Sequence, residues 1–551
     1  KVFPFGAEPA IVIQTPSGEL RAFSAVCTHL ACTVQYRDDL QQIWCACHDG
    51  QLRKSGEEFI YHPWGVAKVC ARLQQPPVVL AAALGAGVVA DMFNLGNTLP
   101  NVVYILVIGG ALNAVFIPEL VRHMKDDADD GKGYADRLIT LVGVVLLVVS
   151  VIAVIAAPWI VRIYATSRYS QEQLDLATAF ARFCLPQIFF YGVYTMLSQV
   201  LNARGRFGAP MFAPIVNNIV AIATFVMFMA AVGPTAVRNG VLTPNEVTLL
   251  GVGTTLGVAA QAAVLIPVLR QARYRFRPNF QWRSVGLGQA GNLAFWTIAL
   301  VAVNQLAYVV VVRLATGVNA VSQQTGGVPA GLTAYTNAHL MFILPHSVIT
   351  VSIVAALLPR MSRQAHAGDY ADLAHDIARG MRSASALIVP SAVGLMVLGT
   401  AAGVLLFNYG ETSTASAEIT GRLAEVFALG LLPFSLYYVI LRGWYALELT
   451  RTAFVVTCLL NALNLAIAVP LFWWVGAHVA GAWALGALAL GYVLAYWITL
   501  AVGWRVLSRR LGGLDTSRTV RTLGRMLLAG AGMLVVMGSV QWGLQHAGLP
   551  G

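Results

Sequence analysis

The sequence predicts an all-α polytopic membrane protein with about thirteen transmembrane helices, preceded by a small β-rich module. The 551 residues are 57% hydrophobic and 11% charged, whereas soluble domains carry about 25% charged residues. Long apolar stretches recur from about residue 78 to the end. The first 77 residues differ, because they hold five of the seven cysteines and equal numbers of acidic and basic residues. This composition excludes a single soluble enzyme, a disordered chain and a secreted disulfide scaffold.

Each apolar stretch is long enough to cross about 30 Å of hydrocarbon as a helix. The runs are continuous rather than alternating, which argues against a barrel. The first is the weakest, because it is short, rich in glycine and carries Asp91. We therefore predict a module at 1–66, a junction at 67–77 and a membrane domain at 78–551. The predicted spans are 78–96, 99–121, 138–164, 176–203, 210–233, 246–269, 290–316, 332–358, 383–408, 421–447, 452–475, 479–504 and 522–545.

The loops between these spans differ in charge, which gives the orientation. Loops after even-numbered spans are rich in Arg and Lys, and the loop from Arg270 to Arg283 has five Arg and no acidic residue. The loop at 317–331 has no charge, and the loop at 409–420 has only Glu411 and Glu418. Since Lys and Arg gather on the cytoplasmic side, we expect a multi-pass protein of the cytoplasmic membrane with a cytoplasmic amino terminus. This topology explains the net charge of +11, so no nucleic-acid partner is expected.

Polar residues inside predicted spans are costly and are therefore candidates for function. Their other interpretation is hydrogen bonding between helices, or snorkelling near a helix end. Pro and Gly inside several spans favour kinked helices around a cavity, as in transporters. The candidates for contact with a substrate are Asp91, Asn101, Asn113, Arg182 and His339.

Short motifs along the membrane domain occur in the order found in a known family. Asp91-Met92-Phe93-Asn94 is followed by Asn97–Asn101 and Gly109–Pro118, and later by Tyr335–His339 and Arg442–Glu448. From Ala82 to about Gly548 the chain resembles the MurJ/MviN lipid II flippases, in particular their actinobacterial branch, which share a superfamily with multidrug and polysaccharide exporters. The resemblance implies a two-lobed fold of fourteen spans, of which one terminal span is missing here.

The resemblance also implies a function, which is transport rather than catalysis. A lipid-linked peptidoglycan precursor would move across the cytoplasmic membrane by alternating access around a cationic cavity. Its pyrophosphate needs Arg or Lys in a pocket of low dielectric constant. We expect the protein to be a monomer or to associate loosely with cell-wall synthesis proteins. We expect no cofactor in the flippase domain.

Several cavity positions of the family differ in this chain. The family has a Ser-Arg-x-x-Gly-x-x-Arg pattern in its first span, where this sequence has Cys70–Pro77. The family's Arg at the foot of span two is Tyr104, and its frequent Asp-Arg in span eight is Asn337-Ala338-His339. We therefore expect Arg72 or Arg182 to substitute for the missing cations of the cavity, and His339 to supply one only if its pKa is favourable.

The first 77 residues carry a second resemblance. Cys27-Thr28-His29 and Cys45-Ala46-Cys47-His48 are separated by fifteen residues, and residues 9–26 are predicted to form short strands around Pro16-Ser17-Gly18. These paired boxes resemble a truncated Rieske module, in which two thiolates hold one iron of a [2Fe–2S] cluster and two imidazoles hold the other. The resemblance implies that Cys27, His29, Cys45 and His48 are the cluster ligands. It further implies a disulfide between Cys32 and Cys47.

Other interpretations of both parts stay open at this point. The boxes also fit a zinc site, or cysteines without a metal. The module could be an artificial fusion, an inactive remnant or part of a redox-linked transporter. The whole chain could instead be a Rieske-type electron-transfer protein with a polytopic membrane domain, or an exporter of another polyprenyl-linked substrate.

Overall fold

The computed structural model describes most of the membrane domain and parts of the module. The described residues are 2–5, 8–14, 20–24, 35–37, 42–45, 50–52, 77–106, 131–204, 206, 208–232, 237, 242–281, 291–479 and 482–546.

Within the described residues, ten helices are long and apolar enough to span a membrane, or eleven if the bent pair α16 and α17 counts as one span. They correspond in order to the third to thirteenth predicted spans, so the predicted all-helical polytopic fold is confirmed. The helices of the membrane domain are α2 (Pro77–Leu84), α3 (Val88–Tyr104), α5 (Lys132–Ile155), α6 (Ala157–Tyr164), α7 (Gln171–Cys184), α8 (Gln187–Ala203), α9 (Gly208–Ala231), α11 (Pro244–Ala263), α12 (Leu265–Gln271), α13 (Gly291–Thr325), α14 (Leu332–Ala367), α15 (Tyr370–Phe407), α16 (Thr414–Ala428), α17 (Leu431–Ala446), α18 (Thr450–His478), α19 (Trp483–Leu511) and α20 (Thr516–His546).

The predicted boundaries of the first two spans are wrong. The helix expected over 78–96 ends at Leu84, and α3 continues without a break through 96–99, where a loop was expected. The break falls at Gly85, whose φ of 70° is left-handed and therefore favours glycine. Pro100 lies inside α3 and does not end it.

Helix ends elsewhere follow local signals in the sequence. Ser170 and Gln173 form a reciprocal capping box at the start of α7, and Thr243 and Glu246 form another at the start of α11. Such caps satisfy backbone N–H groups that have no partner inside the helix. Gly368 ends α14 in the left-handed conformation.

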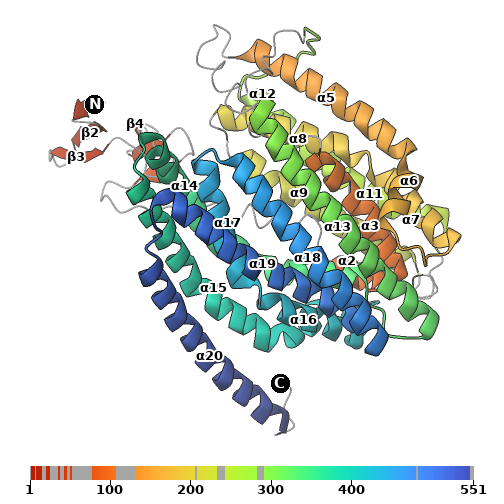
Figure 1. The fold of residues 1–551 in the computed structure, drawn as a ribbon. Helices are drawn as coiled ribbons and strands as arrows, with labels where there is room; N and C mark the ends of the chain where they lie inside the picture. The colour runs from red at the N-terminus through yellow and green to blue at the C-terminus, as the bar shows by residue number, and fades with distance from the viewer. Residues whose placement is uncertain are drawn as a thin grey trace.

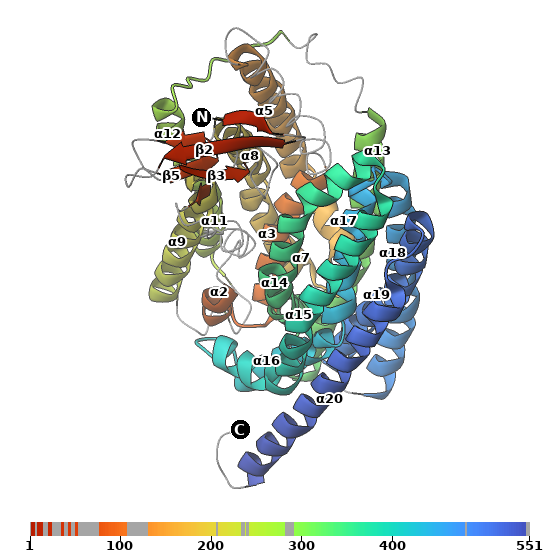
Figure 2. The ribbon, with the colours of Figure 1, turned by 90° about the vertical axis from the view of Figure 1, so that its left-hand side faces the viewer.

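The helices form two groups that we call lobes. The N-terminal lobe holds α2 to α12, and the C-terminal lobe holds α13 to α20; most helix contacts lie within one lobe. Figure 1 shows α5 and α12 in one group, with α15, α16 and α20 in the other. Figure 2 shows α20 at the edge of the C-terminal lobe, where it packs mainly on α15.

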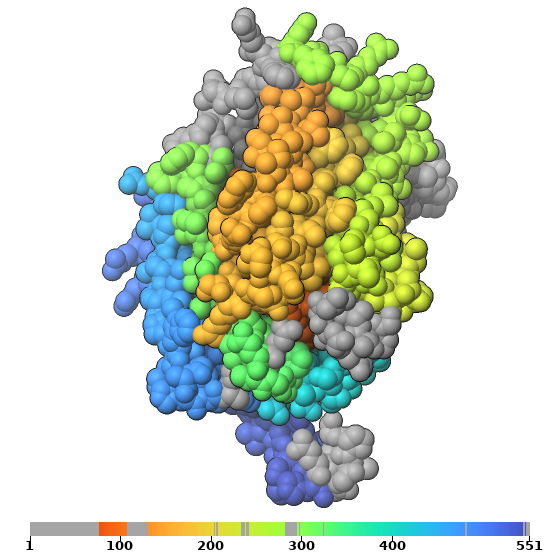
Figure 3. Space-filling view, turned by 90° about the vertical axis from the view of Figure 1, so that its right-hand side faces the viewer, coloured from red at the N-terminus to blue at the C-terminus, as the bar shows by residue number. Residues whose placement is uncertain are grey.

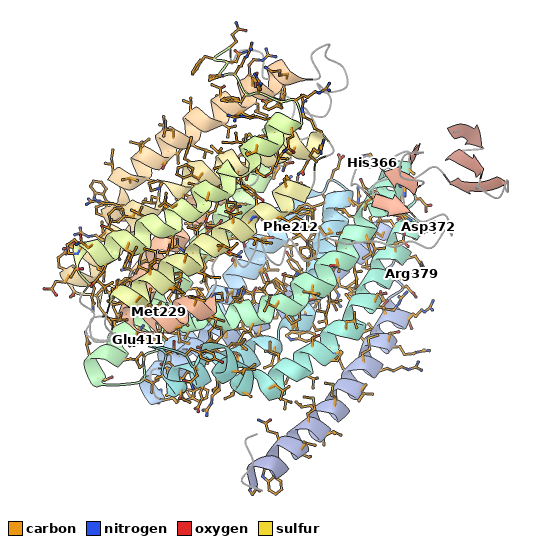
Figure 4. All side chains as sticks on the ribbon, turned by 180° about the vertical axis from the view of Figure 1, so that it is seen from behind. Phe212, Met229, His366, Asp372, Arg379 and Glu411 are labelled. Carbon is orange, nitrogen blue, oxygen red and sulfur yellow. The ribbon has the colours of Figure 1, made fainter. Side chains whose placement is uncertain are left out.

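The two ends of the bundle differ in charge. We call the end with loops 317–331 and 409–420 the low-charge end, and the opposite end the arginine-rich end. In Figure 4, Glu411 lies at the first, and His366, Asp372 and Arg379 lie at the second.

The sides of the bundle between these two ends are apolar. On α5, which Figure 3 shows on the outer surface, the exposed side chains include Leu147, Val148, Val151, Ile152 and Ile155. Such a surface matches a hydrocarbon environment.

The described backbone of the first 52 residues forms six short strands. Strands β1 (Val2–Phe5), β2 (Glu8–Gln14) and β3 (Leu20–Ser24) make one antiparallel sheet, and β4 (Gln35–Arg37), β5 (Gln42–Cys45) and β6 (Gly50–Leu52) make another. Strand β3 and all of β2 except its first residue, Glu8, lie within residues 9–26, for which the sequence predicts short strands.

Candidate functional site

The side chain of Asp91 lies in the first turn of α3, at the low-charge end, and is completely buried. A buried carboxylate is costly unless hydrogen bonds replace its lost hydration. Four donors do so. The Oδ1 atom accepts bonds from the backbone N–H and the hydroxyl of Thr333, both at 2.7 Å. The Oδ2 atom accepts bonds from the backbone N–H of Leu332 and from the amide of Asn319, both at 3.0 Å.

This contact joins the two lobes, because Asp91 belongs to α3 and its donors belong to α13 and α14. Leu332 and Thr333 open α14, so their N–H groups have no acceptor within the helix. The start of a helix also carries partial positive charge, which a carboxylate stabilises. We call this arrangement the Asp91 latch.

Neighbouring residues complete the latch. The Asn94 amide donates to the Thr333 hydroxyl at 2.7 Å, and the Asn319 amide also donates to the Ala86 carbonyl at 3.0 Å. Gly331 precedes α14, and a Cβ atom there would overlap the Asp91 carboxylate and lie 2.7 Å from the Cβ of Asn319. Glycine at 331 therefore permits the close approach of α3 and α14.

A second contact between the lobes lies at the same end. The Thr412 hydroxyl donates to the Ala81 carbonyl at 2.7 Å, and the Glu411 N–H donates to the Ala82 carbonyl at 2.9 Å. The Glu411 bond supplies a partner for the Ala82 carbonyl at the end of α2, where intrahelical donors run out, whereas the Ala81 carbonyl also accepts from the Gly85 N–H at 2.8 Å. Gly410 has a φ of 58° and passes close to Ala82. The loop after α15 thus caps α2 of the other lobe.

Arg313 provides a third contact. Its guanidinium donates to the carbonyls of Arg162 and Ile163, at 3.1 and 3.2 Å, in the last turn of α6. A cation near a helix carboxyl end is favourable. Arg313, a polar residue inside a predicted span, therefore ties α13 to the N-terminal lobe.

The ion pairs described at the arginine-rich end lie within single lobes. Asp376 on α15 accepts from Arg360 on α14 at 2.6 Å, and Asp515 accepts from Arg382 at 3.1 Å. In the N-terminal lobe, Lys132 binds Asp136 at 2.7 Å. Within the described part of the chain, the polar contacts between lobes that we find lie at the low-charge end.

Three other candidate residues lie at intermediate depth. Asn101 is about 15 Å beyond Asp91 along α3, and His339 is about 9 Å beyond Thr333 along α14, at 1.5 Å per residue. Arg182 is about 16 Å from the start of α7, and the adjacent Ala181 packs on Gly96 of α3. These residues therefore lie deeper than the latch, toward the middle of the bundle.

The surroundings of these three side chains differ. Arg182 is exposed, and Asn101 and His339 are partly exposed. Phe342, Phe427 and Tyr492 surround the His339 ring, with centroids 5.4 to 5.8 Å away. Within the described residues, no hydrogen bond joins Asn101, Arg182 and His339 to one another. They lie beyond the latch along their helices, but they do not form one hydrogen-bonded cluster.

The remaining candidates lie outside what the structure describes. Asn113 falls in the gap at 107–130, and the backbone of Cys45 is described without its side chain. The other residues of the two boxes that lie outside the described residues are Cys27, His29, Cys32, Cys47 and His48.

The sequence singled out Asp91 but missed its partners. Asn319 lies within the stretch 317–331 that the sequence predicts as an uncharged loop but that α13 partly occupies, and Thr333 lies just after it. One signal was present, since Gly331 followed by Leu332 and Thr333 at the start of an apolar run resembles a helix start. For other Asn residues inside spans, hydrogen bonding between helices is the alternative to a functional role. Asn461 and Asn304 fit this alternative, because the Asn461 amide donates to the Asn304 side-chain oxygen at 2.9 Å.

Comparison with known proteins gives matches to both parts of the chain. Residues 80–549 match the family model described as lipid II flippase MurJ, and residues 1–60 match the Rieske [2Fe-2S] domain model. A probable lipid II flippase MurJ of Vibrio cholerae is 26% identical over 488 residues, covering 85% of each chain. The corresponding Haemophilus influenzae protein is 25% identical and covers 74% of this chain and 79% of its own length.

Solved structures share the fold. One, titled lipid II flippase MurJ in an inward closed conformation, has a TM-score of 0.65 at 15% identity and covers 86% of this chain and 91% of its own. An inward-facing multidrug resistance MATE family transporter has a TM-score of 0.59 at 14% identity, covering 82% and 96%.

The Asp91→Asn variant is expected to open the low-charge end. The amide has no charge and one oxygen fewer for the four donors, and a charge-assisted hydrogen bond contributes about 1.5–3 kcal/mol. Spin labels on the exposed residues Arg168 and Gln324, in protein whose native cysteines are replaced, report the separation of the lobes by double electron–electron resonance. We expect longer and broader distances in the variant.

The matched control is Asp175→Asn. Asp175 is exposed on α7 and bonds only to Gln171 of its own helix among the described residues. Distance distributions that are the same for both variants would contradict the role of the latch.

Proposed function

The chain belongs to the MurJ family of lipid II flippases, and from this premise we propose that two lobes, closed at one end by the Asp91 latch, move the substrate by alternating access. The match over residues 80–549 carries the family assignment. The protein is a transporter of lipid II in the membrane and not an enzyme.

The loop charges support one orientation. The loops 317–331 and 409–420, which define the low-charge end, lack Lys and Arg, so we assign this end to the outer side of the cytoplasmic membrane and the arginine-rich end to the cytoplasm. The latch then closes the outer side. Contacts within each lobe at the other end would let the lobes separate there and admit a substrate from the cytoplasmic leaflet.

Asp91 acts in this proposal as a gate rather than as a substrate contact. Its two oxygens already accept four hydrogen bonds. A carboxylate would also repel the pyrophosphate of a lipid-linked precursor. For transport to proceed, the latch must break after the headgroup enters and form again after release.

The residues at intermediate depth are proposed to contact the headgroup. A guanidinium such as that of Arg182 can bind two phosphate oxygens at once. His339 and Asn101 could donate hydrogen bonds to phosphate or sugar oxygens, and Asn113 stays a prediction in the same role. The polyprenyl tail would remain in the bilayer beside the apolar outer surface. This scheme requires no cofactor, and the protein could act alone or in loose association with cell-wall synthesis proteins.

A second proposal concerns the first 60 residues, which match the Rieske domain model. The backbone supports it, because the first box follows β3 and the second begins at Cys45, the last residue of β5, which pairs with Gly50 of β6. Two Cys and two His are the donor set of a Rieske centre. Cys27, His29, Cys45 and His48 would hold the cluster, which takes up one electron when bound. A disulfide between Cys32 and Cys47 would join the two boxes.

The transport proposal is tested by growth of cells depleted of their own flippase. We expect the full chain to restore growth and Arg182→Gln to lose most of this activity, because the variant lacks a cation for the pyrophosphate. The matched control, Arg168→Gln, changes an exposed arginine near the low-charge end and should restore growth. Immunoblots of membranes establish equal amounts of protein.

A full chain that reaches the membrane and never restores growth would refute the transport function. Restoration by Arg182→Gln equal to that of the full chain would refute the role of Arg182 alone.

The cluster proposal predicts iron in the purified protein and an electron paramagnetic resonance signal of mixed Cys and His ligation after reduction. Cys45→Ser should abolish both. Cys458→Ser, which changes a partly exposed cysteine on α18, should leave both intact. Protein prepared with iron available but containing neither iron nor the signal would contradict the proposal.

A further inference from the structure

The segment that leaves the N-terminal lobe at the arginine-rich end has a fixed backbone and exposed basic side chains. We call residues 270–281 the arginine strap. Arg270, Arg273, Arg275 and Arg277 are all exposed, and the strap contains no acidic residue. Two aromatic side chains are exposed among them, Phe276 at 42% and Phe280 at 65%.

The buried carboxylate of Asp136 on α5 holds the middle of the strap. Its Oδ1 atom accepts a bond from the Tyr274 hydroxyl at 2.7 Å and one from the Arg277 backbone N–H at 3.3 Å. Its Oδ2 atom accepts from Lys132 at 2.7 Å. Burial and the bond to Asp136 raise the pKa of Tyr274, so its hydroxyl remains a donor.

Two further contacts extend this attachment in both directions. The Arg204 guanidinium donates to the Ala272 carbonyl at 3.2 Å and lies over the Tyr274 ring, 5.2 Å from its centroid. At the other end, the Asn279 N–H donates to the Thr140 hydroxyl at 3.0 Å. The strap is thus attached to the N-terminal lobe at residues 272, 274, 277 and 279.

These attachments sort the strap into two sides. Tyr274 is buried against the lobe, whereas Arg273, Arg275 and Phe276 are exposed. Figure 3 shows the light green strap at the upper end of the orange helix α5. The two residues of α5 that bind the strap, Asp136 and Thr140, are four residues apart, so the strap runs about 6 Å along α5 toward the low-charge end between these bonds. Phe280 follows directly, where α5 enters the apolar stretch predicted over 138–164.

A topology signal alone does not require this arrangement. The positive-inside rule depends on the number of Lys and Arg residues near a span, so it needs neither a fixed backbone nor a buried carboxylate that binds it. Arginines above aromatic side chains are instead suited to the boundary between lipid headgroups and hydrocarbon, where basic clusters bind anionic lipids.

From this geometry we propose that the arginine strap is a binding surface for anionic phospholipid headgroups of the cytoplasmic leaflet. The inference rests on the orientation assigned under the proposed function. The Arg273, Arg275 and Arg277 guanidinium groups bind headgroup phosphates, while Phe276 and Phe280 enter the interface. The Asp136 contacts hold the backbone that carries these side chains in place before lipid binds, which lowers the entropy lost on binding.

The test measures lipid binding and not transport, so its outcome is independent of the flippase function. Full-length protein in detergent is titrated with phosphatidylglycerol or with phosphatidylcholine of the same acyl chains, and bound lipid is counted by native mass spectrometry. We expect a preference for phosphatidylglycerol that weakens as salt is added. The triple variant Arg273→Gln, Arg275→Gln, Arg277→Gln should bind phosphatidylglycerol at least about tenfold more weakly.

The matched control is Arg505→Gln, Arg509→Gln, Arg510→Gln, which removes the same charge from exposed positions at the end of α19. It should change phosphatidylglycerol binding less than about twofold. Equal losses in both triple variants, or none in the strap variant, would overturn the proposal. If the strap variant does not fold, the unaltered protein still decides, because equal binding of the two lipids at every salt concentration would also overturn it.

Discussion

The structure depends on one buried charge. The Asp91 carboxylate has no contact with water, and its position is tolerable only because α13 and α14 supply four donors. Two of these donors are the first N–H groups of α14, which would otherwise lack partners inside the membrane. Each lobe therefore satisfies a polar group of the other. A contact of this kind is strong when complete and costly when half-formed, which suits a gate with two states.

The position of this contact gives the two ends of the protein different roles. At the low-charge end, Asp91, Thr412 and Arg313 each bond to the opposite lobe. At the arginine-rich end, Asp136 and Asp376 hold residues of their own lobe. Lobes joined at one end can separate at the other without breaking their internal contacts. In the orientation that we propose, this asymmetry would allow access from the cytoplasm, and the arginine strap lies at that same end.

Much of the fold is predictable from hydropathy because the third to thirteenth spans are long, continuous and apolar. The first two boundaries are not, since hydropathy cannot distinguish a break at Gly85 from one near Gly96. Asp91 stands out because an acid in a span is costly, but its pairing with Thr333 joins residues 242 positions apart and requires the tertiary fold. The partners of Arg313 are equally hidden from the sequence, because they are backbone carbonyls, which every residue has and no sequence pattern marks.

The central claim is that the latch must open in every transport cycle, and a reversible cross-link tests it most directly. The Asn94 amide lies 2.7 Å from the Thr333 hydroxyl, so Asn94→Cys with Thr333→Cys, in protein without its native cysteines, would place two thiols across the lobes. The account predicts that translocation of lipid II in reconstituted vesicles stops when the disulfide forms and returns when it is reduced. Full translocation by the cross-linked protein would contradict it.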